Sequence, residues 1–198
     1  MKRIIHCMLG GGLCLMAIGC ATTKVSRMEA GEEVDLSGFW NDTDSRLVSE
    51  EMIRDCVARA WLTDFTSEKG KNPRVIVGKV KNKSSEHIAT DTFVKDMEKE
   101  LINSGKVKFV AAKTEREEIR EERADQQKFA DDAKDFFKEK AADFMLQGTI
   151  NSILDTAGGK TVRFYQIELE LTNMESNEKV WIGQKKIKKL VKKSKYGM

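Results

Sequence analysis

The residue types that most often do chemistry at neutral pH are scarce in this sequence. Beyond the first twenty residues, the only cysteine is Cys56 and the only histidine is His87. Zinc sites usually take three or four Cys and His ligands, or a His pair with a carboxylate, and this supply is too small. The patterns G-x-S-x-G, G-x-G-x-x-G and the P-loop are also missing. We therefore expect no enzyme: no catalytic residue, no metal site and no cofactor.

One short acidic run is a candidate cation site. Asn41, Asp42, Thr43 and Asp44 resemble the start of a calcium-binding loop. The run lacks the glycine at the sixth position and the distal bidentate glutamate that such a loop uses. We interpret it instead as a helix-capping turn, because Asn, Asp and Thr are preferred at helix N-termini.

The N-terminus has the pattern of an export signal. Lys2 and Arg3 precede an uncharged, mostly apolar run at residues 8–18. A run of this length is too short to cross a ~30 Å hydrocarbon core as a helix, and it fits the apolar part of a secretory signal peptide.

The end of this leader is more specific. Residues 17–20 (AIGC) resemble the bacterial lipobox, which predicts a lipoprotein signal peptide at residues 1–19 and acylation of Cys20 after cleavage. Ala21 stands where an aspartate would suggest retention in the inner membrane, so we expect export to the outer membrane, facing the periplasm. The alternative is an ordinary signal peptide that is cut near Ala21 or Ala30.

Removal of the leader would leave Cys56 as the one free thiol, since Cys20 would carry lipid. The mature chain could then form no internal disulfide. Cys56 lies in an apolar helical pattern, which predicts a buried and unreactive thiol.

The C-terminal end is strongly basic. Its lysines follow one another without an intervening acid: Lys185, Lys186, Lys188, Lys189, Lys192, Lys193 and Lys195. Such a Lys-rich tail, which we place at residues 191–198, could bind anionic envelope polymers or lipid. The alternative is a solvated edge strand whose lysines discourage edge pairing. We expect no nucleic-acid partner, because an exported lipoprotein rarely meets nucleic acid.

The rest of the chain has the composition of a folded domain. Of 198 residues, 40% are hydrophobic and 34% are charged, which argues against disorder, collagen and coiled coil. We expect a short tether at residues 20–35 and a globular domain at 36–190.

Periodicity predicts the elements of that domain. We expect a helix with Thr43 or Asp44 as its N-cap that continues to Trp61, followed by a loop at 64–73 and a strand at 75–80. A helix with Thr90 or Asp91 as its cap should then run to a stop at Gly105, before a strand at 107–112.

After these come a helix opened by a capping box at 114–117, a further helix around 133–141, a strand at 143–154, a Gly158-Gly159 turn, and strands at 165–171 and 179–187. The predicted fold is α+β: one mixed β-sheet packed against helices and ending in an antiparallel meander.

The helix that begins near residue 114 carries the candidate binding surface. Arg116, Arg120 and Arg123 recur at steps of four and three, which places them on one stripe, and acidic residues fill the neighbouring stripes. Stripes segregated by sign could be recognised by a charge-complementary partner. The alternative is a solvated helix held by its capping box and by Ile119.

Several segments resemble LpoB-type activators of penicillin-binding proteins. The matching segments are residues 35–45 (DLSGFWNDTDS), 77–88 (VGKVKNKSSEHI), 91–93 (DTF), 115–123 (EREEIREER), 142–150 (ADFMLQGTI) and 177–181 (NEKVW). The resemblance implies an outer-membrane lipoprotein whose domain is similar to the amino-terminal domain of TolB. It also implies binding to a bifunctional penicillin-binding protein, a peptidoglycan synthase, and stimulation of its glycan polymerisation and crosslinking.

One feature departs from the best-known member of that family, which carries a long Pro-rich spacer. Here residues 21–35 can span at most ~50 Å when fully extended. The alternative function is an assembly lipoprotein of the outer membrane, similar to curli-secretion lipoproteins.

Overall fold

A computed structural model describes residues 25–132 and 139–192, and the chain divides into two units, residues 1–32 and 33–198. In the first unit, residues 25–32 form no helix or strand, and the Glu32 N–H donates to the Glu29 carbonyl at 3.0 Å. The predicted signal peptide and Cys20 lie outside the described residues. So does most of the helix expected around 133–141, whose last position, Ala141, has no regular structure.

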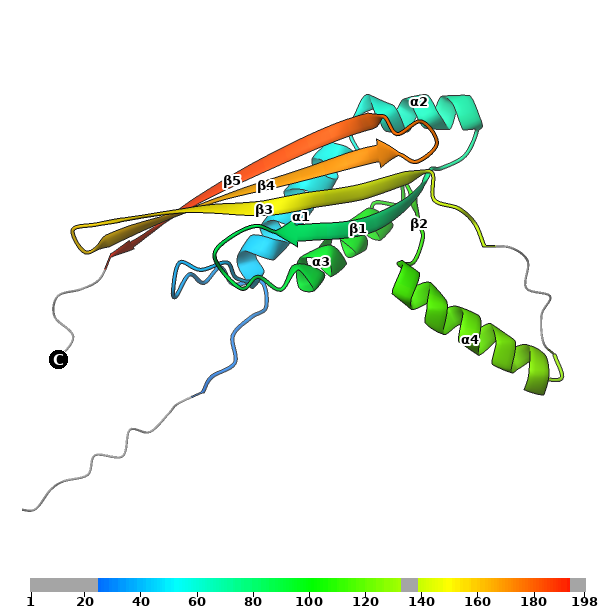
Figure 1. Cartoon of the computed structure of the whole chain (residues 1–198), viewed down its shortest axis with the longest axis horizontal. Helices are drawn as coiled ribbons and strands as arrows, with labels where there is room; N and C mark the ends of the chain where they lie inside the picture. The colour runs from blue at the N-terminus through cyan, green and yellow to red at the C-terminus, as the bar shows by residue number, and fades with distance from the viewer. Residues whose placement is uncertain (1–24, 133–138, 193–198) are drawn as a thin grey trace, which may run out of the picture. The chain divides into compact units, whose positions relative to one another are not determined.

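The second unit contains one sheet and several helices (Figure 1). The elements are α1 (Asp42–Cys56), α2 (Ala60–Lys69), β1 (Arg74–Asn82), α3 (Thr90–Asn103), β2 (Lys108–Phe109), α4 (Lys113–Phe129), β3 (Phe144–Ala157), β4 (Lys160–Asn173) and β5 (Lys179–Lys192). The five strands lie in the order β2-β1-β3-β4-β5. The strands β2, β1 and β3 are parallel, whereas β3, β4 and β5 form an antiparallel meander. The predicted α+β fold is confirmed.

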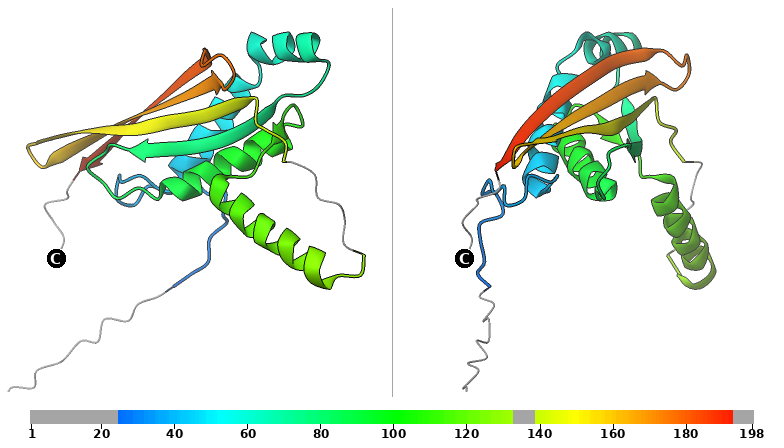
Figure 2. Two further views of the ribbon diagram at one scale, coloured as in Figure 1. Left: turned by 45° about the vertical axis from the view of Figure 1, so that its right-hand side comes forward. Right: turned by 60° about the vertical axis from the view of Figure 1, so that its left-hand side comes forward.

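The core lies between one face of the sheet and helices α1 and α3 (Figure 2). Alternate residues of β4 face it, so that Tyr165, Ile167 and Leu169 are all fully buried. Leu146 and Ile150 of β3 pair with β4 and are also fully buried. Each such aliphatic side chain contributes about 1.5–3 kcal/mol of transfer free energy.

The single helix expected from residue 43 to Trp61 is wrong, because the chain breaks it into α1 and α2. The helix α1 begins after the N-cap Asn41 and ends at Cys56, and Arg59 is extended before α2 begins. At the break, the Trp61 indole N–H donates to the Cys56 carbonyl at 2.7 Å. The break lets Trp61 pack edge-on against Phe144 of β3, with ring centroids 4.9 Å apart.

The expected loop at 64–73 is also wrong in its first half. The helix α2 continues to Lys69 and ends at Gly70, whose positive φ of 65° forms a left-handed cap. Phe65 explains the continuation, because its ring packs 5.3 Å from that of Phe144. The residues around Phe65 in the sequence are mostly polar, so they do not predict this contact.

Further boundaries differ from the predictions, among them the ends of β3 and β4 next to their turn, which lie at Ala157 and Lys160 instead of residues 154 and 165. The strand β2 has two residues, because the chain turns away to start α4. That helix begins two residues earlier than expected, with Ala112 at the N-cap position, and its capping carboxylate is Glu115, which accepts the Ala112 N–H at 2.9 Å. The strand β5 continues to Lys192 because it pairs with β4 as far as Lys160. Two residues of the predicted tail, Val191 and Lys192, therefore belong to the sheet.

We predict that Ile150→Asp or Leu146→Asp unfolds the domain. An unpaired carboxylate at a fully buried position costs several kcal/mol, which is comparable to a whole domain stability of ~5–15 kcal/mol. Thermal melts followed by circular dichroism measure this effect. The matched control is Ile153→Asp on the same strand, where the isoleucine is 65% exposed and the melting temperature should change little.

Candidate functional site

The start of α4 is held by charge. The Lys95 ammonium of α3 contacts the carboxylate of Glu115 and lies 2.7 Å from that of Glu98. The hydrogen bond from Lys95 lowers the pKa of the Glu115 carboxyl, and both carboxylates raise the pKa of Lys95. This contact fixes the first turn of α4 to α3, while no residue of α4 is buried.

The three predicted arginines of α4 gather on a single carboxylate, that of Glu139. Arg120 donates two hydrogen bonds to Glu139, through Nε at 2.8 Å and Nη2 at 2.7 Å. An Nη1 of Arg116 lies 3.6 Å from Glu139, and one of Arg123 lies 3.8 Å from it. The Arg120 guanidinium holds the pKa of Glu139 below its usual value.

The three guanidinium groups form one basic stripe around this carboxylate, while Glu117, Glu118, Glu121 and Glu122 make the neighbouring stripes of α4 acidic. The three arginine side chains keep exposed fractions of 28%, 48% and 36%. The sequence predicted their common stripe correctly, but Glu139 was missed because it lies beyond the next segment of the chain. No short-range pattern connects it to α4.

A second polar cluster fastens residues 33–41, here called the N-terminal strap, to the end of the sheet. Lys189 of β5 places its ammonium 2.5 Å from an oxygen of Asp35 and 2.6 Å from one of Asp44. It also donates to the Phe39 carbonyl at 3.3 Å. The lysines do lie on an edge strand, β5, but Lys189 is only 9% exposed, so the expectation that its side chain is solvated is wrong.

Asp44 also takes part in capping the N-terminus of α1. Its carboxylate accepts the Asn41 N–H at 3.0 Å, and the Asn41 side chain accepts the Asp44 N–H at 3.0 Å. The interpretation of residues 41–44 as a helix-capping turn is thereby confirmed. Burial raises the pKa of Asp44, although Lys189 opposes the shift.

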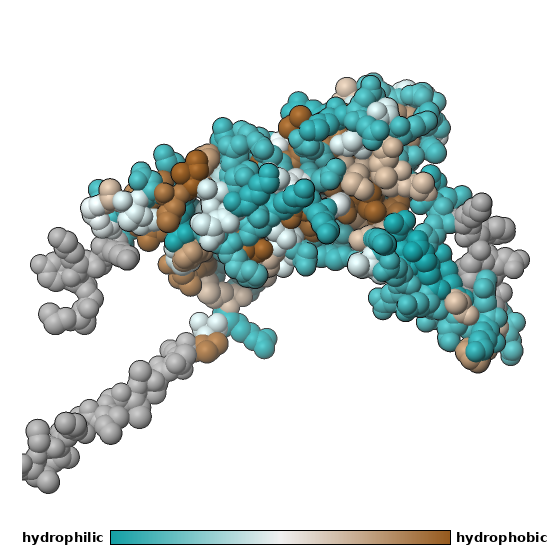
Figure 3. All heavy atoms as spheres, viewed as in Figure 1, coloured by the Kyte–Doolittle hydropathy of each residue, from teal (hydrophilic) through white to brown (hydrophobic). Residues whose placement is uncertain are grey.

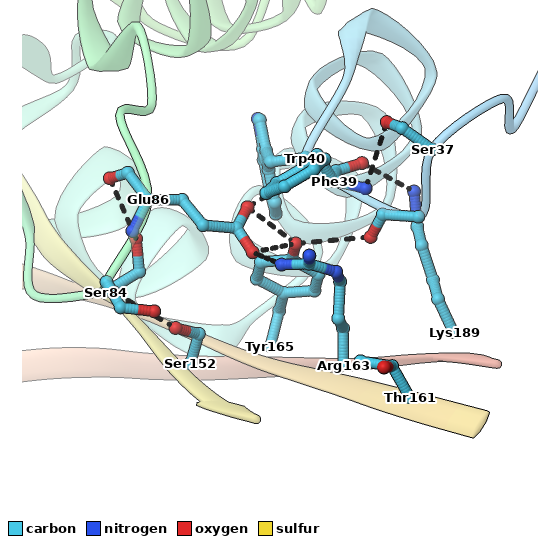
Figure 4. Close-up of polar contacts among 12 residues, drawn as sticks. Ser37, Phe39, Trp40, Ser84, Glu86, Ser152, Thr161, Arg163, Tyr165 and Lys189 are labelled. Atoms are coloured by element: carbon cyan, nitrogen blue, oxygen red, sulfur yellow. Dashed lines mark hydrogen bonds and ion pairs between the residues drawn. The ribbon is translucent and has the colours of Figure 1, made fainter. Parts of the chain in front are cut away.

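Glu86 joins the loop after β1 to the same end of the sheet (Figure 4). Its carboxylate accepts the Tyr165 hydroxyl at 2.7 Å and lies 2.5 Å from an Nη of Arg163. Burial and this hydrogen bond raise the pKa of Tyr165. The Arg163 guanidinium covers the ring of Phe39 at 3.7 Å, so strap and loop meet on one pair of β4 side chains.

The strap also approaches the backbone closely at Gly38. This residue has a φ of +71°, and a Cβ built on it would lie 2.4 Å from Val191 Cγ2. Only glycine fits both the backbone conformation and the space. The cluster therefore acts as a fastening rather than as an acid–base site, because its charged groups are taken up by one another.

Cys56 and the C-terminal lysines are the other candidates from the sequence. Cys56 is 1% exposed, and burial raises the pKa of its thiol to about 12, which confirms the predicted buried thiol. Five of the C-terminal lysines lie in β5, and Lys185 among them pairs with Glu51 of α1. Lys193 and Lys195 lie outside the described residues. Within the described ranges, no group of three or more metal-ligating residues comes together, and no helix is long and apolar enough to span a membrane.

Comparisons with known proteins give one family. The family model of the peptidoglycan-synthase activator LpoB matches residues 44–187. No curated protein matches the chain. Among solved structures, the LpoB carboxy-terminal domain from Salmonella enterica is 12% identical with a TM-score of 0.43, and the match covers 73% of this chain and 98% of that one.

Two other solved structures are similar. The LpoB carboxy-terminal domain from Escherichia coli is 11% identical with a TM-score of 0.40, over 70% of this chain and 97% of that one. Lipoprotein GNA1162 from Neisseria meningitidis is 12% identical with a TM-score of 0.38, over 62% and 86% of the two chains. At these identities and scores they add nothing to the family match.

We predict that Lys189→Met destabilises the domain by about 3 kcal/mol, because Asp44 then remains buried without its cation. For a domain of this size the melting temperature should fall by about 10 °C. The matched control is Lys188→Met, one residue away on the exposed side of β5, which should melt with the parent protein.

The pH dependence of the Lys189→Met effect is a further check. Because the pKa of Asp44 is raised above 3.8, a proton binds it more tightly in the folded chain. Its contribution to stability is present below the ordinary pKa and is lost as the pH rises through the folded pKa. Lys189→Met enlarges the shift, so the gap between variant and parent should narrow as the pH falls. A constant gap would contradict the role assigned to this pair.

Proposed function

The chain belongs to the family of the peptidoglycan-synthase activator LpoB, and from this premise we propose that it is a non-enzymatic lipoprotein that binds a bifunctional penicillin-binding protein. Binding would stimulate glycan polymerisation and crosslinking by that synthase. The observation that carries the proposal is the extent of the family match, residues 44–187, which runs from the first turn of α1 into β5. No observation favours the alternative of an assembly lipoprotein similar to curli-secretion lipoproteins.

The architecture agrees with a regulator that works by contact. The charged groups at the end of the sheet are used in fastening the strap, and Cys56 is buried. The catalytic groups would then belong to the synthase. This chain would supply a binding surface, as expected where binding alone shifts the conformation of a partner.

We propose that the arginines of α4 form part of that surface. Since no residue of α4 is buried, most of its surface beyond the contacts with Lys95 and Glu139 is available for a partner. Arg116, Arg120 and Arg123 form a basic stripe around the carboxylate of Glu139, and this stripe could steer an acidic partner surface toward that side of the helix.

We further propose that the chain is anchored in the outer membrane. Cys20 would be acylated after removal of residues 1–19, residues 20–35 would serve as the tether, and the domain at 36–190 would face the periplasm from the outer membrane. The lysine-rich end at 191–198 could add contacts to anionic envelope polymers.

Activation is tested with the full chain in detergent and the purified periplasmic synthase of the same cell. We expect faster glycan polymerisation when the chain is added. Arg116→Glu combined with Arg120→Glu should weaken binding at low salt by about tenfold or more, since like charges then face each other across the interface. The melting curve should change little, because neither side chain belongs to the core and exposed or half-exposed ion pairs stabilise little.

The matched control reverses the same number of charges elsewhere. Lys186→Glu combined with Lys188→Glu alters exposed side chains of β5 and should leave the affinity unchanged. Equal affinity of parent and arginine variant would exclude α4. The contact would then have to be sought on the exposed edge of the sheet and in the 84–87 loop.

Lipid attachment is tested by Cys20→Ala. We expect this variant to leave the membrane fraction or to remain as an uncleaved precursor, because stable anchoring requires more than one acyl chain and the modified cysteine supplies them. Membrane fractionation and the mass of the mature chain measure the outcome. A processed variant that stays in the membrane fraction would contradict the lipobox interpretation.

A further inference from the structure

Exposed apolar side chains gather at one end of the sheet, around the turn between β3 and β4. Ile153 is 65% exposed, Leu154 54% and Leu190 56%. The strap adds Leu36, which is 94% exposed, and Phe39, which is 46% exposed. We call these five residues the hydrophobic end. Figure 3 shows brown patches over this part of the molecule.

The sheet register makes one side of this end continuous. Ile153 pairs with Phe164, and Val162 pairs with Leu190, so four apolar side chains lie on neighbouring positions of the face opposite the helices. Leu154 pairs with Arg163 on the other face, where Arg163 covers Phe39. Apolar side chains therefore project from both faces of the hairpin.

Apolar side chains on both faces favour a lipid surface over a folded protein as the partner. A folded protein partner typically covers a single face with a close-packed patch. A lipid surface can surround a projecting hairpin, so that both faces transfer apolar area out of water.

The charges near the hydrophobic end select an anionic surface. Lys160 and Lys192 lie opposite each other in the β4–β5 ladder, an unfavourable pairing of like charges, and Lys188 follows on the same strand. All three lysines are exposed. The acids of this end are Asp35 and Asp44, which are bonded to Lys189, Glu86, which is bonded to Arg163, Asp155 at the tip of β3, and Glu33 of the strap. The three exposed lysines have no acid among their β4–β5 ladder partners. Anionic lipid attracts basic residues by about 1 kcal/mol for each one near the surface.

The tether arrives at the same end. Asp35 is held by Lys189, the neighbour of Leu190, and about 15 residues separate it from Cys20. That length spans at most ~50 Å, so an acylated Cys20 would keep the hydrophobic end near the membrane that holds the lipid.

We propose that the hydrophobic end docks on an anionic phospholipid bilayer, an inference that rests on the lipid attachment proposed above. The helix α4 lies away from the β3–β4 turn in each view (Figures 1 and 2). Docking would thus orient the arginines of α4 away from the membrane that carries the anchor.

The test places an environment-sensitive fluorophore at the hydrophobic end of the acylated full chain. Ile153→Cys accepts a thiol-reactive label, whereas Cys56 is buried and its raised pKa keeps it unreactive. In vesicles that contain phosphatidylglycerol, we expect a several-fold rise in emission and a blue shift. Ile182→Cys is the matched control, because Ile182 is 61% exposed on the same sheet but distant from the β3–β4 turn, and its label should stay in water.

Charge is tested in the same labelled chain. Lys188→Gln combined with Lys192→Gln should shift the ratio of docked to undocked chains about thirtyfold toward undocked at low salt. With vesicles of pure phosphatidylcholine, which carry no net charge, the parent chain should likewise shift toward the undocked state.

Several results would overturn the inference. A label at position 153 that reports water in anionic vesicles would show that the end does not dock. A signal that depends on protein density rather than on lipid would assign the patch to a second copy of the chain. The mass of the mature chain shows separately whether Cys20 carries lipid, and activation is measured in detergent, so failure of either proposal is distinguishable from failure of docking.

Discussion

A single buried ammonium group, that of Lys189, connects the first part of the domain to its last strand. Asp44 caps α1 and Asp35 lies in the strap, and both reach Lys189 across about 150 residues of sequence. Because Asp44 and Lys189 are both buried, separating them would leave two unpaired charges out of water. Their contact therefore positions α1 against the sheet. The path of the strap, the close approach at Gly38 and the point where the tether arrives all depend on this contact.

The core of the domain is separate from the surface that we propose for partner binding. Helices α1 and α3 cover one face of the sheet and supply the core, whereas α4 contributes nothing to it. Its position depends on exposed or half-exposed ion pairs with Lys95 and Glu139, which stabilise little individually. A helix held in this way can change its surface sequence without loss of the fold, which suits a role in partner recognition.

The proposed activities occupy different ends of the same sheet. The strap and the β3–β4 turn would face lipid, and α4 would face the synthase. With a tether of about 15 residues, this chain would hold its domain close to its own membrane. Reach toward a synthase of the inner membrane would then have to come from the synthase.

Local chemistry in the sequence determined the export signal pattern, the alternation of β3 and β4, the capping turn at residues 41–44 and the arginine stripe. These follow from neighbours a few positions apart, which periodicity and cap preferences report directly. Tertiary structure alone decided the break between α1 and α2, the gathering of arginines on Glu139 and the burial of Lys189. Each of these depends on a partner far away in the chain: Phe144 for Trp61, Glu139 for Arg120, and Asp44 for a lysine that its own neighbours make look solvated. Charge and packing energies act through space, so the chain order of such residues carries no signal of the contact.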